Sequence, residues 1–168
     1  MKKFQNMNNW QELLKIAYEK AQKSTNISTQ NAAVLIDNNQ NIILSEVNSF
    51  PNGVNETKER QADKVVRFKY SVHAERNVIY SAAKKGIKTE GLIMVCPWAT
   101  CSECAQAIIQ AGIKKIVVHK QALDRNGHWQ DDIDFAFNML REAGVEIVIF
   151  DGKIEVGKIL RSGEYWEP

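Results

Sequence analysis

The chain has 168 residues and a mass of 19.1 kDa, which is enough for one packed core and too small for two ordinary domains. Hydrophobic residues make up 44% and charged residues 25% of the chain, which excludes the disordered and fibrous classes. The formal net charge of +2 excludes a broad basic surface for duplex nucleic acid. We therefore predict a single domain over residues 1–168 that acts on a small or locally held substrate.

No stretch of the sequence approaches the roughly 20 apolar residues that a bilayer span requires. Residues 1–10 are polar and do not resemble a secretory leader, so we predict a cytoplasmic protein with no membrane partner. Cysteine occurs only three times, at Cys96, Cys101 and Cys104. An odd number of crowded cysteines is a poor disulfide framework and favours metal binding or catalysis.

The first predicted elements are a helix and a hairpin. Apolar residues recur at helical spacing after a possible N-cap at Asn8 or Asn9, which predicts an amphipathic helix over residues 9–23. Two short apolar runs, at residues 32–36 and 42–47, flank a polar segment and predict a hairpin with a tight turn.

A polar, highly charged stretch follows from residue 48 to about residue 69, and we predict a long functional or mobile loop there. Its basic residues lie close in sequence to the motifs described below and are candidates, as a group, for holding a phosphate. For each residue singly, a solvated charged loop explains the sequence equally well. The basic residues are Lys58, Arg60, Lys64, Arg67 and Lys69.

Strands and helices then alternate along the chain. The apolar spacing and the glycines that end each helix predict helices over residues 73–85, 102–111 and 132–143, and strands over residues 92–96, 116–119 and 145–150. Together with the leading hairpin, this order predicts an α/β fold, a three-layer αβα sandwich with a mixed five-stranded sheet. Residues 151–168 show little periodicity, so no element is predicted there.

The starts of two predicted helices carry residues that can bind a metal. Cys101 and Cys104 are three apart on a first helical turn, so both thiolates can reach one ion, and His73 at a neighbouring helix start can complete three ligands. Two sulfurs and an imidazole suit zinc better than magnesium or calcium. Three protein ligands are typical of catalytic zinc, which keeps a position for water, whereas structural sites use four. Cys96 or His119 as a fourth ligand would give a closed structural site, but neither has the spacing of a chelating loop.

Glu75 stands two residues after His73 and is predicted to lie beside the water bound to the metal. Zinc lowers the pKa of such a water towards neutrality, and a carboxyl group can then shuttle protons during attack on an amidine-like ring carbon. The structural alternative for Glu75 is a charge that stabilises the helix N-terminus.

These motifs resemble the zinc-dependent cytidine and deoxycytidylate deaminase superfamily, whose HxE and CxxC signature is a known pattern. The resemblance is greatest to deoxycytidylate (dCMP) deaminases. Residues 73–79 resemble their HAExNAI helix, residues 48–53 their N-G-x-P-x-G loop, and residues 104–113 their CAxxIIxAGI segment. It implies a cytidine-deaminase-like fold, Zn2+ held by His73, Cys101 and Cys104, and Glu75 as the catalytic proton shuttle.

The resemblance also implies the substrate contacts. Asn48 would hydrogen-bond the deoxyribose hydroxyl and Tyr70 would lie near the substrate, while Ala74 and Thr100 would contact it beside the metal ligands. Thr100 replaces the proline that the family has before the first cysteine. Trp98 and Trp129 are candidates for a wall against the base, although a tryptophan at such a position more often belongs to the core.

The predicted reaction is hydrolytic deamination of a cytosine nucleotide, dCMP to dUMP and ammonia. Alternatives with the same chemistry are a modified dCMP, cytidine, guanine, or adenosine in tRNA, the last disfavoured by the low net charge. An alternative of another class is a non-catalytic, zinc-stabilised binding module. The family resemblance implies a homo-oligomer as well.

Overall fold

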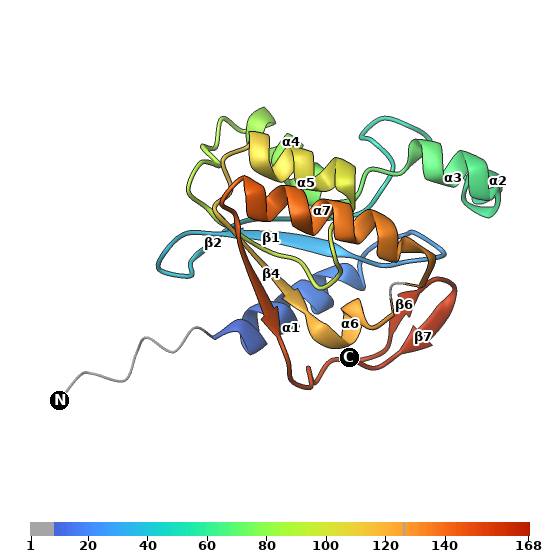
Figure 1. Ribbon diagram of the computed structural model, residues 1–168. Coiled ribbons are helices and arrows are strands. Elements are labelled where there is room, and N and C mark those ends of the chain that lie inside the picture. Colours follow the sequence, from blue (N-terminus) through green and yellow to red (C-terminus); the bar gives the residue numbers. More distant parts are fainter. Residues whose placement is uncertain (1–8, 126) are drawn as a thin grey trace.

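The computed structural model describes residues 9–125 and 127–168 and has a mixed sheet at its centre (Figure 1). In spatial order, its five strands are β2 (Ile42–Val47), β1 (Ala32–Ile36), β3 (Ile93–Val95), β4 (Lys115–His119) and β5 (Glu146–Phe150). β1 pairs antiparallel with both β2 and β3, whereas β3, β4 and β5 run parallel. The predicted mixed five-stranded sheet is confirmed.

Helices cover both faces of the sheet (Figure 1). One face packs against α4 (Ala74–Lys84), α5 (Ser102–Gln110) and α7 (Gln130–Glu142), and the other packs against α1 (Trp10–Ala21). Successive residues of β1 enter the two cores in turn: Ala33 and Leu35 face the three helices, while Val34 faces α1. Burial on both faces explains why β1 is a continuous apolar run, and the predicted three-layer αβα sandwich is confirmed.

The predicted elements in this core are close to the observed ones. Each strand and helix begins or ends within two residues of its predicted bounds. Asn9 caps α1, because its side-chain oxygen accepts a hydrogen bond from the Glu12 amide at 3.3 Å. The other candidate cap, Asn8, lies outside the described residues. No helix in the described part of the chain has the length and apolar character needed to cross a membrane.

The prediction of one long loop over residues 48–69 is wrong in its second half. This segment contains α2 (Lys58–Ala62), and α3 (Lys64–Tyr70) follows it directly. Thr57 caps α2 by accepting from the Arg60 amide at 3.3 Å, and Asp63 caps α3 by accepting from the Val65 amide at 2.9 Å. None of the residues of α3 is buried. These short helices therefore lack the apolar stripe on which the sequence prediction depended.

The C-terminal segment also has structure that periodicity does not predict. β6 (Ile159–Arg161) and β7 (Glu164–Trp166) form a separate hairpin, and Ile159 and Trp166 are buried in the core on the α1 side. Ser162 and Gly163 make the two-residue turn, both with positive φ, at 52° and 86°. Two short elements, α6 (Lys120–Leu123) and the 3-10 turn η1 (Gly127–Trp129), connect β4 to α7.

Candidate active site

The site lies where two helices begin. His73 is the N-cap of α4 and Cys101 is the N-cap of α5, and neither side chain makes a capping hydrogen bond. Both residues have extended backbone, with ψ of 150° and 168°. Their side chains are therefore free for other partners, and the positive ends of two helix dipoles point at the same place.

The structure brings the three predicted metal ligands together. His73 Nδ1 lies 3.3 Å from the Cys101 sulfur and 3.5 Å from the Cys104 sulfur, and the three ligand atoms all lie within 4.8 Å of one another. Ordinary Zn–S and Zn–N bond lengths around a tetrahedral ion place nitrogen and sulfur about 3.5 Å apart. The donor set and its spacing thus fit zinc.

Neither alternative fourth ligand joins this group. Asn31 Nδ2 donates to the Cys96 sulfur at 3.4 Å, and Cys96 is absent from the only His/Cys/Asp/Glu cluster found among the described residues. The imidazole of His119 is held between the Tyr18 hydroxyl and the Gly152 carbonyl, at 2.8 Å from each. Among the described residues, the cluster therefore offers three ligand atoms, from His73, Cys101 and Cys104.

The electrostatics of the cluster favour a thiolate. A hydrogen bond from the Cys104 thiol, together with the adjacent His73, lowers the pKa of Cys101 to about 4 despite its burial. The same hydrogen bond and burial raise the pKa of Cys104, so Cys101 is the first of the two to ionise. Burial works against a charged imidazole, but the hydrogen bond to Cys101 and the charge of Glu75 raise the pKa of His73 overall.

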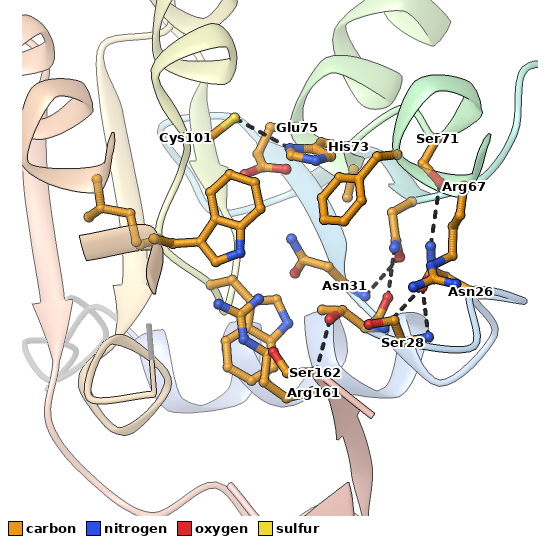
Figure 2. Close-up of a pocket in the computed structure, with 18 of the residues that line it drawn as sticks. Asn26, Ser28, Asn31, Arg67, Ser71, His73, Glu75, Cys101, Arg161 and Ser162 are labelled. Atoms are coloured by element: carbon orange, nitrogen blue, oxygen red, sulfur yellow. Dashed lines mark hydrogen bonds between the residues drawn. The ribbon is translucent and has the colours of Figure 1, made fainter. Parts of the chain in front are cut away.

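Glu75 lies beside this cluster, as Figure 2 shows. Its side chain is 2% exposed, and its Oε2 has no hydrogen-bond partner within the described residues. Burial raises the pKa of the Glu75 carboxyl, because a buried carboxylate is poorly solvated. A carboxyl group with a free oxygen and a raised pKa can accept a proton and release it again.

Two further interactions hold the helices that carry the ligands. Asp132 of α7 accepts from the Ser102 amide at 2.9 Å and from the Ser102 hydroxyl at 2.6 Å, so a carboxylate from another helix covers the start of α5. Arg76 of α4 forms an ion pair with Glu103 of α5 at 2.9 Å. The metal-binding ends of α4 and α5 are thereby fixed relative to each other and to α7.

A pocket of about 390 Å³ opens next to the cluster. His73, Glu75 and Cys101 line one part of it, and the side chains of Phe68, Trp98 and Trp129 contribute aromatic walls. Phe68 and Trp129 contact each other with ring centroids 6.0 Å apart. A pocket of this size, in which aromatic rings stand beside polar and charged side chains, is typical of small-molecule sites.

Three of the five predicted substrate residues, Asn48, Ala74 and Trp98, line this pocket. The Asn48 amide also has partners in the protein, since its oxygen accepts from the Asn31 amide at 2.9 Å and its nitrogen donates to the Thr29 carbonyl at 2.7 Å. Trp98 is 2% exposed, so it serves the core and the pocket together.

Tyr70 and Thr100 do not line the pocket. The Tyr70 ring is 39% exposed and packs on Phe50, with ring centroids 5.5 Å apart, while the Arg60 guanidinium lies 5.0 Å from its centre. Thr100 is buried, with 2% of its surface exposed. Both residues therefore lie close to the metal motifs in the sequence but outside the lining of the pocket.

Of the basic residues predicted as a group, Lys64 and Arg67 line the pocket, and the others do not. The prediction missed Arg161 and Ser162, which the C-terminal hairpin brings to the pocket, as well as Ser28 from the loop before β1. A signal for the hairpin was present: Ser162 and Gly163 form a turn dipeptide between two short runs of strand-forming residues.

Residues 7–120 match the family model described as the cytidine and deoxycytidylate deaminase zinc-binding region. The chain is 42% identical over 79 residues to the deoxycytidylate deaminase of Enterobacteria phage T2, covering 47% of this chain and 38% of the phage protein. It is 31% identical over 120 residues to an uncharacterized deaminase in the luxG 3' region of Aliivibrio fischeri, covering 71% of this chain and 78% of that protein.

The human deoxycytidylate deaminase is 29% identical over 144 residues, covering 81% of this chain and 76% of that enzyme. Among solved structures, the dCMP deaminase from the cyanophage S-TIM5, in complex with dCMP and dUMP, matches with a TM-score of 0.61 and 21% identity, covering 83% of this chain and 94% of that one. The likeness to the cyanophage structure shows a shared fold. The match to the phage T2 protein spans well under half of that protein's length.

Proposed function

This chain belongs to the cytidine and deoxycytidylate deaminase family, and we propose that it catalyses the zinc-dependent hydrolysis of a cytosine nucleotide, dCMP, to dUMP and ammonia. The observation that carries this proposal is the buried Glu75 carboxyl, with an unpartnered oxygen, next to the His73, Cys101 and Cys104 cluster. A merely structural metal site has no need of a buried acid beside it, because burial of a carboxyl without partners destabilises the fold.

His73, Cys101 and Cys104 would hold the zinc ion. When bound, zinc supplies a nucleophilic water at neutral pH, because it lowers the pKa of that water towards 7. The protein's own part is to hold the cytosine ring with C4 towards this position. The backbone at Ala74 and the indole of Trp98, both on the pocket wall, support such an orientation. Asn48, which also lines the pocket, would contact the deoxyribose.

Glu75 would move the protons. Its carboxylate takes a proton from the water as the C4–O bond forms and delivers it to N3 of the ring. It then passes the second proton of the attacking oxygen to the 4-amino group, so that the C4–N bond breaks and ammonia leaves. The sum is dCMP and water converted to dUMP and ammonia, with Glu75 returned to its starting state.

Ammonia release from a panel of compounds tests this function. The panel contains dCMP, a 5-modified dCMP, cytidine, guanine and a tRNA with a target adenosine, each given to the zinc-loaded full chain. We expect the highest kcat/KM for dCMP. A higher kcat/KM for another compound of the panel would mean that this compound is the substrate of the same reaction. If no compound released ammonia, a non-catalytic binding module would be supported instead.

The relatives that carry the name deoxycytidylate deaminase also support our proposals on organisation. We propose that residues 1–168 form a single deaminase domain, that the chain assembles into homo-oligomers, and that it acts in the cytoplasm. Native mass spectrometry checks the assembly, and fluorescence microscopy of the tagged chain checks the location. A monomeric mass at working concentration would contradict the proposed homo-oligomer.

A further inference from the structure

The C-terminal hairpin brings a cation to the pocket from outside the region that matches the family model, residues 7–120. We propose that Arg161 of β6 binds the 5'-phosphate of the substrate, so that this hairpin selects a nucleotide over the corresponding nucleoside. The proposal rests on the proposed function, because it assigns the anionic group of that function's substrate.

The hairpin is held firmly against the loop before β1. The Gln30 amide donates to the Leu160 carbonyl at 2.9 Å, and the Leu160 amide donates to Gln30 Oε1 at 3.2 Å. At the turn, the Ser162 amide donates to Thr29 Oγ1 at 3.1 Å, and the Gly163 amide donates to the Ser28 carbonyl at 2.8 Å. Arg161 therefore projects from a preorganised support, which reduces the entropy that ligand binding must overcome.

The charge of Arg161 has no counter-ion. Across residues 9–125 and 127–168, no carboxylate forms an ion pair with it, and its Nε is buried without a hydrogen-bond partner. Its guanidinium lies 4.4 Å from the centre of the Trp98 ring, so the indole face fixes its plane. The half-buried Arg76, in contrast, pairs with Glu103 at 2.9 Å. A half-buried guanidinium left unpaired beside a pocket is suited to an anion that enters it.

Arg161 lies at the other end of the pocket from the metal cluster (Figure 2). Figure 2 shows Arg161 and Ser162 at one margin of the pocket and His73, Glu75 and Cys101 at the opposite margin. The reacting ring carbon and the phosphate likewise lie at opposite ends of a nucleoside monophosphate. Glu75 is the only acidic residue that lines the pocket in the described part of the chain, and it lies at the metal margin. Among the described lining residues, Glu75 is therefore the one carboxylate that acts on the charge of Arg161.

The other two cations of the pocket are less available. The Arg67 guanidinium already donates to the Gln61 carbonyl, and the Lys64 ammonium lies 5.9 Å from the Phe68 ring centre on an exposed helix. A guanidinium offers two parallel N–H groups to phosphate oxygens, which an ammonium does not. Burial also lowers the pKa of Arg161, and a bound anion would offset this loss of solvation.

Binding of dUMP and of deoxyuridine to the full chain, measured by calorimetry, tests the proposal. We expect Arg161→Met to weaken dUMP binding roughly 10- to 100-fold, the usual value of a hydrogen bond to a charged group, and to leave deoxyuridine binding unchanged. Arg161→Lys should lose less than Arg161→Met, since it keeps the charge. Arg125→Met is the matched control, because Arg125 lies 4.6 Å from the Trp166 ring centre but is exposed and does not line the pocket.

A second measurement applies even where deoxyuridine binds weakly. Inorganic phosphate should raise the melting temperature of the wild type and of Arg125→Met, and raise it less in Arg161→Met. Wild-type dUMP affinity in Arg161→Met, or equal weakening of dUMP and deoxyuridine, would overturn the proposal. If the wild type bound dUMP through Arg161 but released ammonia from no cytosine compound, the phosphate site would stand and the proposed function would be wrong.

Discussion

The two ends of the pocket are built in different ways. At the metal end, His73 and Cys101 are caps of two consecutive long helices, and Cys104 is on the first turn of the second. At the other end, Arg161 comes from a hairpin that contacts Gln30, 130 residues away in the sequence. The metal end thus depends on short, fixed spacings, whereas the anion end depends on how the C-terminal segment packs.

Their chemical requirements differ as well. Zinc accepts few side chains, and the proton shuttle must be an acid, so substitutions at the metal end should abolish the reaction. A phosphate accepts any well-placed donor, and Lys64, Arg67, Ser28 and Ser162 line the same pocket as Arg161. The comparison therefore predicts that substitutions at the metal end abolish activity, whereas substitutions at the anion end weaken substrate binding by degrees.

Removal of a metal ligand gives the largest expected effect. Cys101→Ala should lower zinc affinity by more than the roughly 10- to 100-fold that loss of an outer-shell partner causes, and ammonia release should stop. Metal analysis of the purified variant and the ammonia assay check this. Cys96→Ala is the control, because Cys96 is buried against Asn31. This variant should keep both zinc and activity. Stoichiometric zinc in Cys101→Ala would show that Cys101 is not needed to hold the metal.

Glu75→Gln should leave the metal in place and remove the proton transfer. We expect kcat to fall roughly 10²- to 10⁴-fold, the usual contribution of a general acid–base group, while zinc content stays at the wild-type level. Glu19→Gln, at an exposed position of α1, should retain wild-type rates. A Glu75→Gln enzyme with near-normal kcat would show that the carboxyl only stabilises the helix start.

The metal end could be predicted from the sequence because its residues lie in two short motifs at the starts of two predicted helices. The spacing of Cys101 and Cys104 on one helical turn is fixed by helix geometry, and the apolar periodicity of the flanking strands and helices predicted the sheet that positions them. The same periodicity predicted the order of the layers. The αβα sandwich and the closeness of His73, Cys101 and Cys104 therefore follow from patterns in the sequence.

The anion end could not be predicted in the same way. α3 has no buried residue, and each strand of the C-terminal hairpin has only three residues, so neither has a periodic pattern long enough to recognise. Arg161 reaches the pocket because the hairpin pairs with Gln30, a contact that no local signal encodes. Tyr70, for which the family resemblance implies a position near the substrate, packs on Phe50 outside the lining of the pocket, and its substrate contact stays a prediction.

Asp132 allows a smaller test of the metal end. Its carboxylate caps the start of α5, 2.9 Å from the Ser102 amide, and so positions the turn that carries the two cysteines. Asp132→Asn keeps only one of the two acceptor oxygens, so it should destabilise the fold by about 1 kcal/mol, the usual value of one hydrogen bond, and should weaken zinc about 10-fold. Thermal denaturation and zinc competition check these values. Asp134→Asn, on the same helix and bonded to the Gln130 side chain, should change neither.

If Asp132→Asn lowered stability but left zinc affinity unchanged, the cap would serve the helix alone. The metal end would then hold its geometry through the ligands themselves. The expected result, a loss of both, would instead show that the fixed spacing of the ligands is maintained by a neighbouring helix.

The smallest expected effect concerns the support of the C-terminal hairpin. His119 is fully buried, and its ring stacks on Trp166 of β7 with centroids 6.4 Å apart. Because the Gly152 carbonyl can only accept, the Nε2 at 2.8 Å from it carries the proton, and Nδ1 accepts from the Tyr18 hydroxyl. The neutral imidazole therefore satisfies both of its neighbours.

Burial lowers the pKa of His119 below its ordinary value of about 6.5. As the pH falls through 6.5, the unfolded chain binds a proton at this residue before the folded chain does, so the free energy of unfolding decreases by at most about 1.4 kcal/mol per pH unit. Protonation of the zinc ligands adds its own slope, which a His119→Gln variant retains. We expect urea denaturation between about pH 7.5 and 5.5 to show a smaller decrease in the free energy of unfolding for His119→Gln than for the wild type. Equal decreases would mean that His119 does not contribute to the pH dependence of stability.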